Sequence, residues 1–149
     1  MKTYKLNDLN NPLISVLMPA YNAEKYIKEA IESILNQTFS NFEFIIIDDG
    51  SIDATEEIIK SFKDSRIVYI KNEKNLGLIK TLNKGISIAR GEFIARMDSD
   101  DISMPQRFEL QLDVFKKYKG VDIVNVALKK MSEDGTKLSK YRHNIYPGF

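Results

Sequence analysis

Short apolar runs alternate with amphipathic helical patterns along most of this chain of 149 residues. The apolar runs have the length of buried strands, and the segments between them repeat apolar residues at the spacing of one helix face. A chain with this pattern buries its strands in a sheet and covers the sheet with helices, so the alternation predicts an α/β layered fold. Strands are expected at residues 13–18, 42–47, 66–71, 91–97 and 121–128, and helices at 23–37, 53–62, 78–89 and 105–118.

Local signals predict where several of these elements begin and end. Asp53 precedes Glu56 by three residues, which is the spacing of a capping box, so Asp53 is expected to cap the second helix. Pro105 suits the first position of the fourth helix. Asp134 and Gly135 predict the turn of a hairpin that follows the fifth strand.

Composition and charge exclude several classes of protein. The 22 basic and 21 acidic residues nearly cancel, which leaves no field for bulk binding of nucleic acid. The chain has no cysteine, so it forms no disulfide and no thiolate metal site. The N-terminal segment lacks the apolar core of a signal peptide, and no apolar run approaches the roughly 20 residues that cross a bilayer. We therefore expect a cytoplasmic protein.

Polar residues gather directly after three of the expected strands. Residues 48–51 follow the second strand, and residues 98–101 follow the fourth with three carboxylates in four positions. Residues 19–22 leave the first strand at the same edge. Because ligands of open α/β sheets bind outside the carboxyl ends of the strands, these segments predict one shared ligand-binding crevice.

The acidic segment has the composition of a divalent cation site. Carboxylates massed together raise one another's pKa unless a cation neutralises them. Asp98 and Asp100 form an Asp-x-Asp pair, whose oxygen ligands suit Mg²⁺ or Mn²⁺ and leave coordination positions for phosphate. Asp48 follows a different strand, where its carboxylate can accept hydrogen bonds from a base or ribose. Together these residues predict a nucleoside diphosphate bound with a divalent metal.

Each motif also has a purely structural interpretation. Asp-x-Asp pairs and segments such as 48–51 are common in turns, and Asp101 suits a helix cap. Asn22 tolerates the left-handed conformation that can close the first strand, and residues 75–77 fit a turn before a helix equally well. His143, the only histidine, lies in a polar tail and receives no catalytic role. The functional hypothesis depends on the three strand ends together.

The order of these motifs resembles that of a known enzyme family. The segments ISVLMPAYNAEKYIKEAIESILNQTFSNFEFIIIDDGSIDAT and NEKNLGLIKTLNKGISIARGEFIARMDSDDISMPQRFELQ are similar to inverting glycosyltransferases of family 2, which have the GT-A fold. The resemblance covers residues 13 to about 128 and looks closest to enzymes that build bacterial capsular polysaccharide, exopolysaccharide or O-antigen. It implies a Rossmann-like, three-layer α/β/α domain with a mostly parallel central sheet, truncated at the C-terminus.

The resemblance also implies roles for individual residues. Asp48 would bind the base of a nucleotide-sugar donor, expected to be a UDP-sugar. Asp98 would reach the ribose or a metal-bound water, and Asp100 would coordinate the Mn²⁺ or Mg²⁺ that bridges the diphosphate. The metal residues implied are thus Asp100 and Asp98. The donor-binding residues implied are Pro19, Ala20, Tyr21, Glu24, Asp48, Asp49, Ser51, Asn75, Gly77, Lys80, Arg96, Asp98 and Ser99.

One position departs from the family pattern. Many family members carry an Arg-Asn pair where this chain has Leu82 and Asn83. The donor-phosphate contact of that arginine is therefore missing here. Lys80, nearly one helical turn earlier, is the candidate to replace it.

The reaction implied is direct displacement at the anomeric carbon, with a general base that deprotonates an acceptor hydroxyl. In the family, this carboxylate base and most of the acceptor site follow the first half of the domain, which here means beyond Phe149. The expected organisation is an N-terminal extension at 1–12, a nucleotide-sugar-binding domain at 13–128, and a hairpin and tail at 129–149 that begin the acceptor half.

Three classes of function stay open. The first is a glycosyltransferase that acts on a saccharide or lipid-linked saccharide, with peripheral association at the cytoplasmic face of the inner membrane as an option. The second is a nucleotide-sugar or metal-binding module without transferase activity, because the general base is absent from this chain. The third is a receiver-like signalling domain, which ranks last because its acidic pair would follow the first strand, where residues 19–22 stand. No oligomeric state is predicted.

Overall fold

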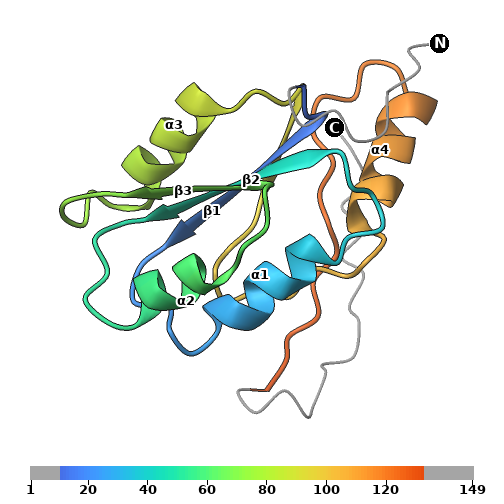
Figure 1. Ribbon diagram of the computed structural model, residues 1–149. Helices are drawn as coiled ribbons and strands as arrows, with labels where there is room; N and C mark the ends of the chain where they lie inside the picture. Colours follow the sequence, from blue (N-terminus) through green and yellow to red (C-terminus); the bar gives the residue numbers. More distant parts are fainter. Residues whose placement is uncertain (1–10, 133–149) are drawn as a thin grey trace. The chain divides into compact units, whose positions relative to one another are not determined.

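The structure is a computed structural model that describes residues 11–132. These residues belong to two compact units, Met1–Leu110 and Gln111–Phe149, and the first unit contains the sheet. Strands and helices alternate along the chain as the sequence predicts (Figure 1). The elements are β1 (Ile14–Ala20), α1 (Ile27–Leu35), β2 (Phe42–Asp48), α2 (Thr55–Ser61), β3 (Ile67–Lys71), α3 (Leu78–Ile88), β4 (Phe93–Arg96) and α4 (Arg107–Lys117).

The four strands form one parallel sheet in the order β3-β2-β1-β4. The register pairs Ala20 with Asp48 and Asp48 with Lys71, and on the other side of β1 it pairs Leu17 with Arg96. Strand order reverses at β1, which lies between β2 and β4. The carboxyl ends of β2, β1 and β4 therefore lie side by side, where ligands of such sheets bind.

Helices cover both faces of the sheet, which confirms the three-layer α/β/α arrangement (Figure 1). On one face α3 packs over a buried cluster of Leu17, Ile45 and Ile47. Gly85 lets α3 approach closely, because a Cβ at this position would lie 3.2 Å from the Ile47 side chain. On the other face lie α1 and α2, and α1 buries Ile27, Ala30, Ile31 and Ile34. Burial of this apolar surface is the main favourable term in folding.

β1 carries a proline although it lies inside the sheet. The Met97 amide donates to the Leu17 carbonyl at 2.9 Å, and this is the last rung between β1 and the chain of β4. Pro19 lies two residues beyond Leu17, so its nitrogen turns to the same side, where β4 has already ended at Arg96. The ladder thus loses no hydrogen bond at Pro19.

An ion pair between the buried Glu43 and the half-exposed Arg90 joins the sheet to the α3–β4 connection at the opposite edge. The Glu43 carboxylate accepts hydrogen bonds from Ser15 Oγ at 2.6 Å and from the Arg90 backbone and side chain at 2.7 and 2.8 Å. Ser15 Oγ in turn accepts from the Gly91 amide at 2.8 Å. Burial raises the pKa of Glu43, but the hydrogen bonds from Ser15 and Arg90 outweigh burial and hold this pKa below its ordinary value. Glu43 therefore stays ionised inside the fold.

The predicted fifth strand is wrong. Residues 121–128 form no ladder with any strand among the described residues, and Ile123, Val126 and Leu128 are exposed, Ile123 at 79% and Leu128 at 74%. An apolar run becomes a strand only when a neighbouring strand accepts its backbone hydrogen bonds. The hairpin predicted around Asp134 and Gly135 lies outside the described residues. The described helices include none long and apolar enough to cross a membrane.

Candidate functional site

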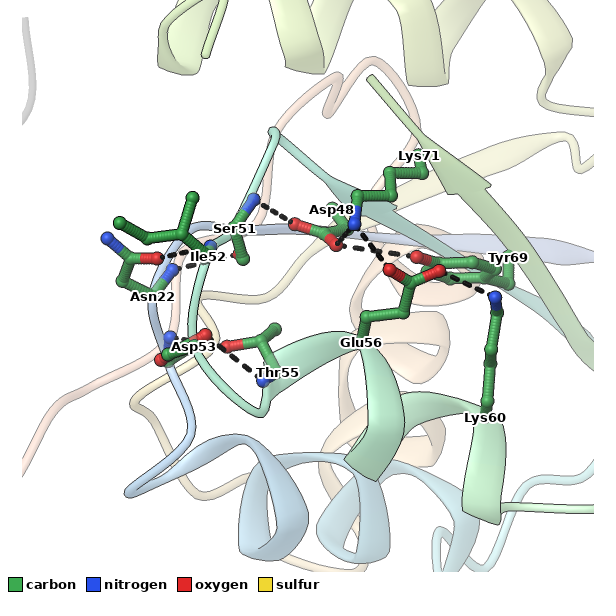
Figure 2. Close-up of polar contacts among 11 residues, drawn as sticks. Asn22, Asp48, Ser51, Ile52, Asp53, Thr55, Glu56, Lys60, Tyr69 and Lys71 are labelled. Carbon is green, nitrogen blue, oxygen red and sulfur yellow. Dashed lines mark hydrogen bonds and ion pairs between the residues drawn. The ribbon is translucent and has the colours of Figure 1, made fainter. Parts of the chain in front are cut away.

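Two loops at the carboxyl edge of the sheet are joined by reciprocal hydrogen bonds. The Asn22 amide donates to Ser51 Oγ at 2.9 Å, and Asn22 Oδ1 accepts from the Ile52 amide at 3.0 Å (Figure 2). Asn22 adopts the left-handed conformation, with φ of 49°, as the sequence predicts for a residue that closes the first strand. The loop after β1 is therefore fixed to the loop after β2.

A second reciprocal pair joins the same loops at the start of α2. Glu24 Oε2 accepts from the Ala54 amide at 3.0 Å, and Asp53 Oδ2 accepts from the Glu24 amide at 3.1 Å. Asp53 Oδ1 accepts from the Thr55 amide, so Asp53 does serve the helix start. The predicted capping box is wrong in both positions, because the N-cap is Ala54, without a side-chain cap, and Glu56 pairs with lysines.

Asp48 is fully buried at the end of β2, within a polar network that Figure 2 shows. Its Oδ1 accepts from the Ser51 amide at 2.8 Å, and its Oδ2 accepts from the Tyr69 hydroxyl at 3.3 Å. The Lys71 ammonium lies 3.9 Å from the same Oδ2 and also pairs with Glu56 on α2. The sequence places Asp48 at a ligand edge, and the structure adds that this carboxylate already has protein partners there.

Asp49 points to the opposite face of the sheet and holds the segment before α3. Its Oδ1 accepts from Asn72 Nδ2 at 2.7 Å and from the Leu76 amide at 2.9 Å, and its Oδ2 accepts from the Gly77 amide at 2.9 Å. Burial raises the pKa of Asp49, but the hydrogen bonds from Leu76, Asn72, Thr81 and Gly77 outweigh it, so the pKa lies below its ordinary value. Asp49 therefore ties the loop after β2 to the segment before α3.

Glycine is required where the loop after β2 meets the segment before α3. Gly50 has φ of 78°, and a Cβ there would lie 2.7 Å from the backbone carbon of Lys74. Gly77 has φ of 87° and precedes α3, and its amide also donates to Asn75 Oδ1 at 2.9 Å. Asn75 and Gly77 thus form a turn before a helix, one interpretation that the sequence leaves open, and this turn lies at the carboxyl edge of the sheet.

The acidic segment follows β4 directly. Arg96 donates to Asp98 with Nε–Oδ1 at 3.0 Å and Nη2–Oδ2 at 3.2 Å, while Asp100 is exposed. Partial desolvation and the charges of Asp100 and Asp98 raise the pKa of Asp101, against the opposing charges of Arg107 and Arg96. The segment therefore carries more negative charge than its arginines balance.

This donor set fits a hard divalent cation in part. Excess negative charge on carboxylate oxygens is what Mg²⁺ and Mn²⁺ bind. Among residues 11–132, no group of three carboxylate or histidine side chains converges on one point. Asp98 and Asp100 would therefore hold a metal only together with oxygens from a ligand such as a diphosphate.

The remaining residues implied by the resemblance are placed as follows. Pro19 and Ala20 end β1, and Tyr21 follows them with its side chain exposed. Lys80 is exposed in the first turn of α3, and Ser99 lies half-buried between Asp98 and Asp100. Leu82, at the position where family members carry arginine, packs on the buried cluster under α3.

Sequence reasoning missed the residues that surround Asp48. Tyr69 and Lys71 lie two residues apart on β3 and share a face with Asp48, which is the register partner of Lys71. A signal existed, since side chains at i and i+2 of a strand point to the same face. The pairing of β2 with β3 had to be known before that signal placed them beside Asp48.

Comparison with solved structures gives the class of the fold. S. aureus TarS 1–349 in complex with UDP-GlcNAc superposes with a TM-score of 0.67 and 26% sequence identity, covering 80% of this chain and 39% of TarS. The chain has the α/β fold of the GT-A glycosyltransferases. Residues 15–148 match the model of glycosyl transferase family 2, and the chain belongs to this family.

Curated relatives agree with that assignment. An uncharacterized glycosyltransferase of Methanocaldococcus jannaschii is 42% identical over 145 residues, which cover 95% of this chain and 50% of the relative. The UDP-Glc:alpha-D-GlcNAc-diphosphoundecaprenol beta-1,3-glucosyltransferase WfgD of Escherichia coli is 37% identical over 123 residues, covering 78% of this chain and 49% of WfgD. The chain spans about half the length of these two relatives.

Proposed function

We propose that this chain is the donor-binding part of a glycosyltransferase that takes a nucleoside diphosphate sugar, a UDP-sugar in the first instance. The sugar passes with inversion to a hydroxyl of a saccharide or lipid-linked saccharide in the synthesis of a bacterial surface polysaccharide. The membership in family 2 supports the reaction type. The named acceptor of WfgD and the UDP-GlcNAc bound to TarS support the two substrate classes.

The observation that carries the proposal is the convergence of polar segments at one sheet edge. β1 lies between β2 and β4, so the loops after these strands are neighbours. The strand register supports placing the two acidic segments at the same height along the strands. Arg96 is the register partner of Leu17, so Asp98, two residues later, lies level with Pro19. Pro19 is in turn paired with Ile47, next to Asp48.

Each segment has a distinct task in this proposal. Asp48 accepts the N–H of the base, and Tyr21 lines the base from the loop after β1. Asn75 and Gly77, which Asp49 holds in place, border the base and ribose. Asp98 and Ser99 reach toward the ribose and diphosphate. Glu24 and Ser51 act indirectly, because both fix one loop to the other.

Asp100, with Asp98, holds Mn²⁺ or Mg²⁺ in the proposed site. A divalent ion supplies positive charge that stabilises the departing diphosphate when it is bound. The acidic segment has three carboxylates, those of Asp98, Asp100 and Asp101, against the two guanidinium groups of Arg96 and Arg107, and this excess of negative charge supports a cation near it. Arg96 is proposed to contact a phosphate of the donor, because it pairs with Asp98 and its side chain is 54% exposed.

A second candidate is a nucleotide-sugar-binding module without transfer. The hydrogen bonding of the carboxylates at this sheet edge favours the binding module. Asp48 and Asp49 accept hydrogen bonds from protein groups, and Asp98 pairs with Arg96. A general base needs a free lone pair aimed at the acceptor hydroxyl. The two candidates differ in product formation: only the transferase converts a donor and a lipid-linked acceptor to a glycoside.

Calorimetric titration with UDP, in Mn²⁺ and in excess chelator, tests the donor site. We expect Asp100→Ala to remove the gain in affinity that Mn²⁺ confers, and Asp48→Ala to weaken UDP binding about tenfold with or without the ion. Asp113→Ala on the exposed surface of α4 is the matched control and should bind as the unchanged chain does. Equal affinity in Asp48→Ala, Asp100→Ala and the unchanged chain would remove the site assignment.

A further inference from the structure

The carboxylate of Asp48 has a limited number of positions left for a ligand. Each carboxylate oxygen has two lone pairs. Oδ1 accepts the Ser51 amide, and Oδ2 accepts the Tyr69 hydroxyl. Burial and the carboxylates of Asp48 and Glu56 raise the pKa of Tyr69, so its hydroxyl stays protonated and remains a donor. Oδ1 and Oδ2 therefore each keep one lone-pair direction, and the Lys71 ammonium lies on the side of Oδ2.

Lys71 lies beside Asp48 Oδ2 but forms no hydrogen bond with it. Its ammonium is 3.9 Å from Asp48 Oδ2, beyond the usual range for a hydrogen bond of about 2.7–3.2 Å. The Lys71 side chain is 39% exposed, whereas that of Asp48 is fully buried. A ligand that approaches Asp48 from the carboxyl edge therefore meets the Lys71 ammonium next to the carboxylate.

Glu56 fixes Lys71 in this position. The Glu56 carboxylate pairs with Lys71 through one oxygen and with Lys60 through the other, and these two lysines hold the pKa of Glu56 at about 2. The ion pair with Glu56 also raises the pKa of Lys71. The ammonium thus stays charged and tethered to α2 while its remaining N–H bonds are available.

We propose that Lys71 is a specificity-determining residue that selects nucleotides whose base carries a carbonyl next to a ring N–H. Asp48 accepts the N–H, and Lys71 donates to the neighbouring carbonyl oxygen. Uracil has this pattern, and so does guanine at its Watson–Crick edge. Cytosine presents the reverse, a ring nitrogen without hydrogen next to an amino group. This inference rests on the proposed function, since it assumes that a nucleotide binds at Asp48.

The physical basis is the penalty on unpaired polar groups. With cytosine at this place, the buried carboxylate faces a ring-nitrogen lone pair and the ammonium faces an amino group, so neither finds a partner. Sites built around such hydrogen bonds reject the mismatched analogue far more strongly than apolar pockets do. Because Lys71 is partly exposed, water recovers part of its loss, and the expected discrimination is about 30-fold rather than the thousands seen in closed sites.

Competing titrations with UDP and CDP test the role of Lys71, because these ligands differ only at the base edge. We expect the unchanged chain to bind UDP about 30-fold more tightly than CDP. Lys71→Met keeps the apolar stem and removes the ammonium; we expect it to weaken UDP about tenfold and CDP less than about twofold. Lys71→Arg keeps a charged donor and should retain a preference for UDP of at least about tenfold.

Lys60→Met is the matched control. Lys60 also pairs with Glu56, at 2.5 Å, and lies over the Tyr69 ring at 5.5 Å, but it does not contact Asp48. We expect this variant to keep the UDP preference within about twofold. Thermal unfolding of every variant verifies that each one is folded before the titrations are compared.

The outcomes separate the inference from the proposed function. Failure of the unchanged, folded chain to bind either nucleotide overturns both. Binding of UDP with the preference unaltered in Lys71→Met, or with UDP and CDP weakened equally, overturns the role of Lys71 alone. A loss of preference confined to Lys71→Met, with Lys71→Arg and Lys60→Met close to the unchanged chain, supports it.

Discussion

Replacing Asp49 by asparagine changes one buried oxygen into an amide nitrogen and tests how the edge of the site is held. The Asp49 carboxylate accepts hydrogen bonds from Asn72, Leu76 and Gly77 at 2.7 to 2.9 Å. Asparagine can keep the two bonds to Oδ1, but its amino group then faces the Gly77 amide, so donor meets donor. The change removes the negative charge that strengthens the surviving bonds.

The magnitude follows from these contacts. Loss of charge assistance in two buried hydrogen bonds and loss of a third cost about 3 kcal/mol together. The Gly77 amide keeps Asn75 Oδ1 as an acceptor at 2.9 Å, which lowers the expected loss to about 2 kcal/mol. In a protein of this size, that corresponds to a fall in Tm of about 4–8 °C.

Urea unfolding at pH 7, followed by circular dichroism, measures this loss. The matched control is Asp53→Asn, the same substitution four residues away in the same loop. Asp53 accepts from Thr55 and Glu24 at positions more open to water, so its loss should stay below about 1 kcal/mol. If the two variants lose the same stability, the carboxylate of Asp49 does not hold the segment before α3 and our reasoning on this edge is wrong.

Three further predictions concern the same fold. Gly50→Ala should destabilise the chain by more than Gly77→Ala. A Cβ at Gly50 collides with the Lys74 backbone at 2.7 Å, whereas at Gly77 only the strain of a positive φ, about 1–2 kcal/mol, applies. Thermal unfolding of the two variants measures which one loses more stability. Arg90→Met should cost about 2 kcal/mol by urea unfolding, since it leaves the buried Glu43 with Ser15 and one backbone amide. Arg66→Met should cost less, because its partner carboxylate, Asp64, is 27% exposed whereas that of Glu43 is 4% exposed. Glu43 and Asp49 have folded pKa values below their ordinary 4.5 and 3.8, so the stability that they contribute is complete above those ordinary values and disappears as pH falls through the folded ones. Urea midpoints measured from pH 7 to pH 3 should therefore stay level above about pH 5 and fall below it. The fall should be less steep in Asp49→Asn, which has lost one of the two carboxylates.

The sequence predicted the sheet well because the signal for each strand was local. β1 to β4 are apolar runs followed by polar residues, and the helices between them have a regular apolar face. The run at 121–128 has the same composition and forms no strand, because a strand also depends on a partner that composition does not reveal. The prediction of the capping box was wrong for a related reason. Glu56 forms an ion pair with Lys71, 15 residues away, instead of a hydrogen bond to a backbone amide at the helix start.

The candidate site was predictable in its location but not in its contacts. Strand ends place residues 48–51 and 98–101 at one edge, and this followed from the order of elements alone. The long-range bonds that fix this edge join residues 21 to 32 positions apart, such as Asn22 with Ser51 and Asp49 with Leu76. Such partners depend on tertiary geometry, so the contacts by which Glu24 and Ser51 join the two loops could not be predicted from the sequence.

The two adjacent aspartates at the end of β2 illustrate how one strand can serve stability and binding at once. Successive side chains of a strand point to opposite faces. Asp49 therefore turns toward α3, where Asn72, Leu76 and Gly77 donate to its oxygens. Asp48 turns toward α2, where Oδ2 accepts one hydrogen bond, from Tyr69, and keeps a second lone-pair direction beside the Lys71 ammonium at 3.9 Å. A ligand N–H can take that direction with little loss, because Lys71 stays paired with Glu56. Of the two carboxylates, Asp48 is thus the one whose geometry suits a base, and exchange of their roles would require the strand to slip by one residue.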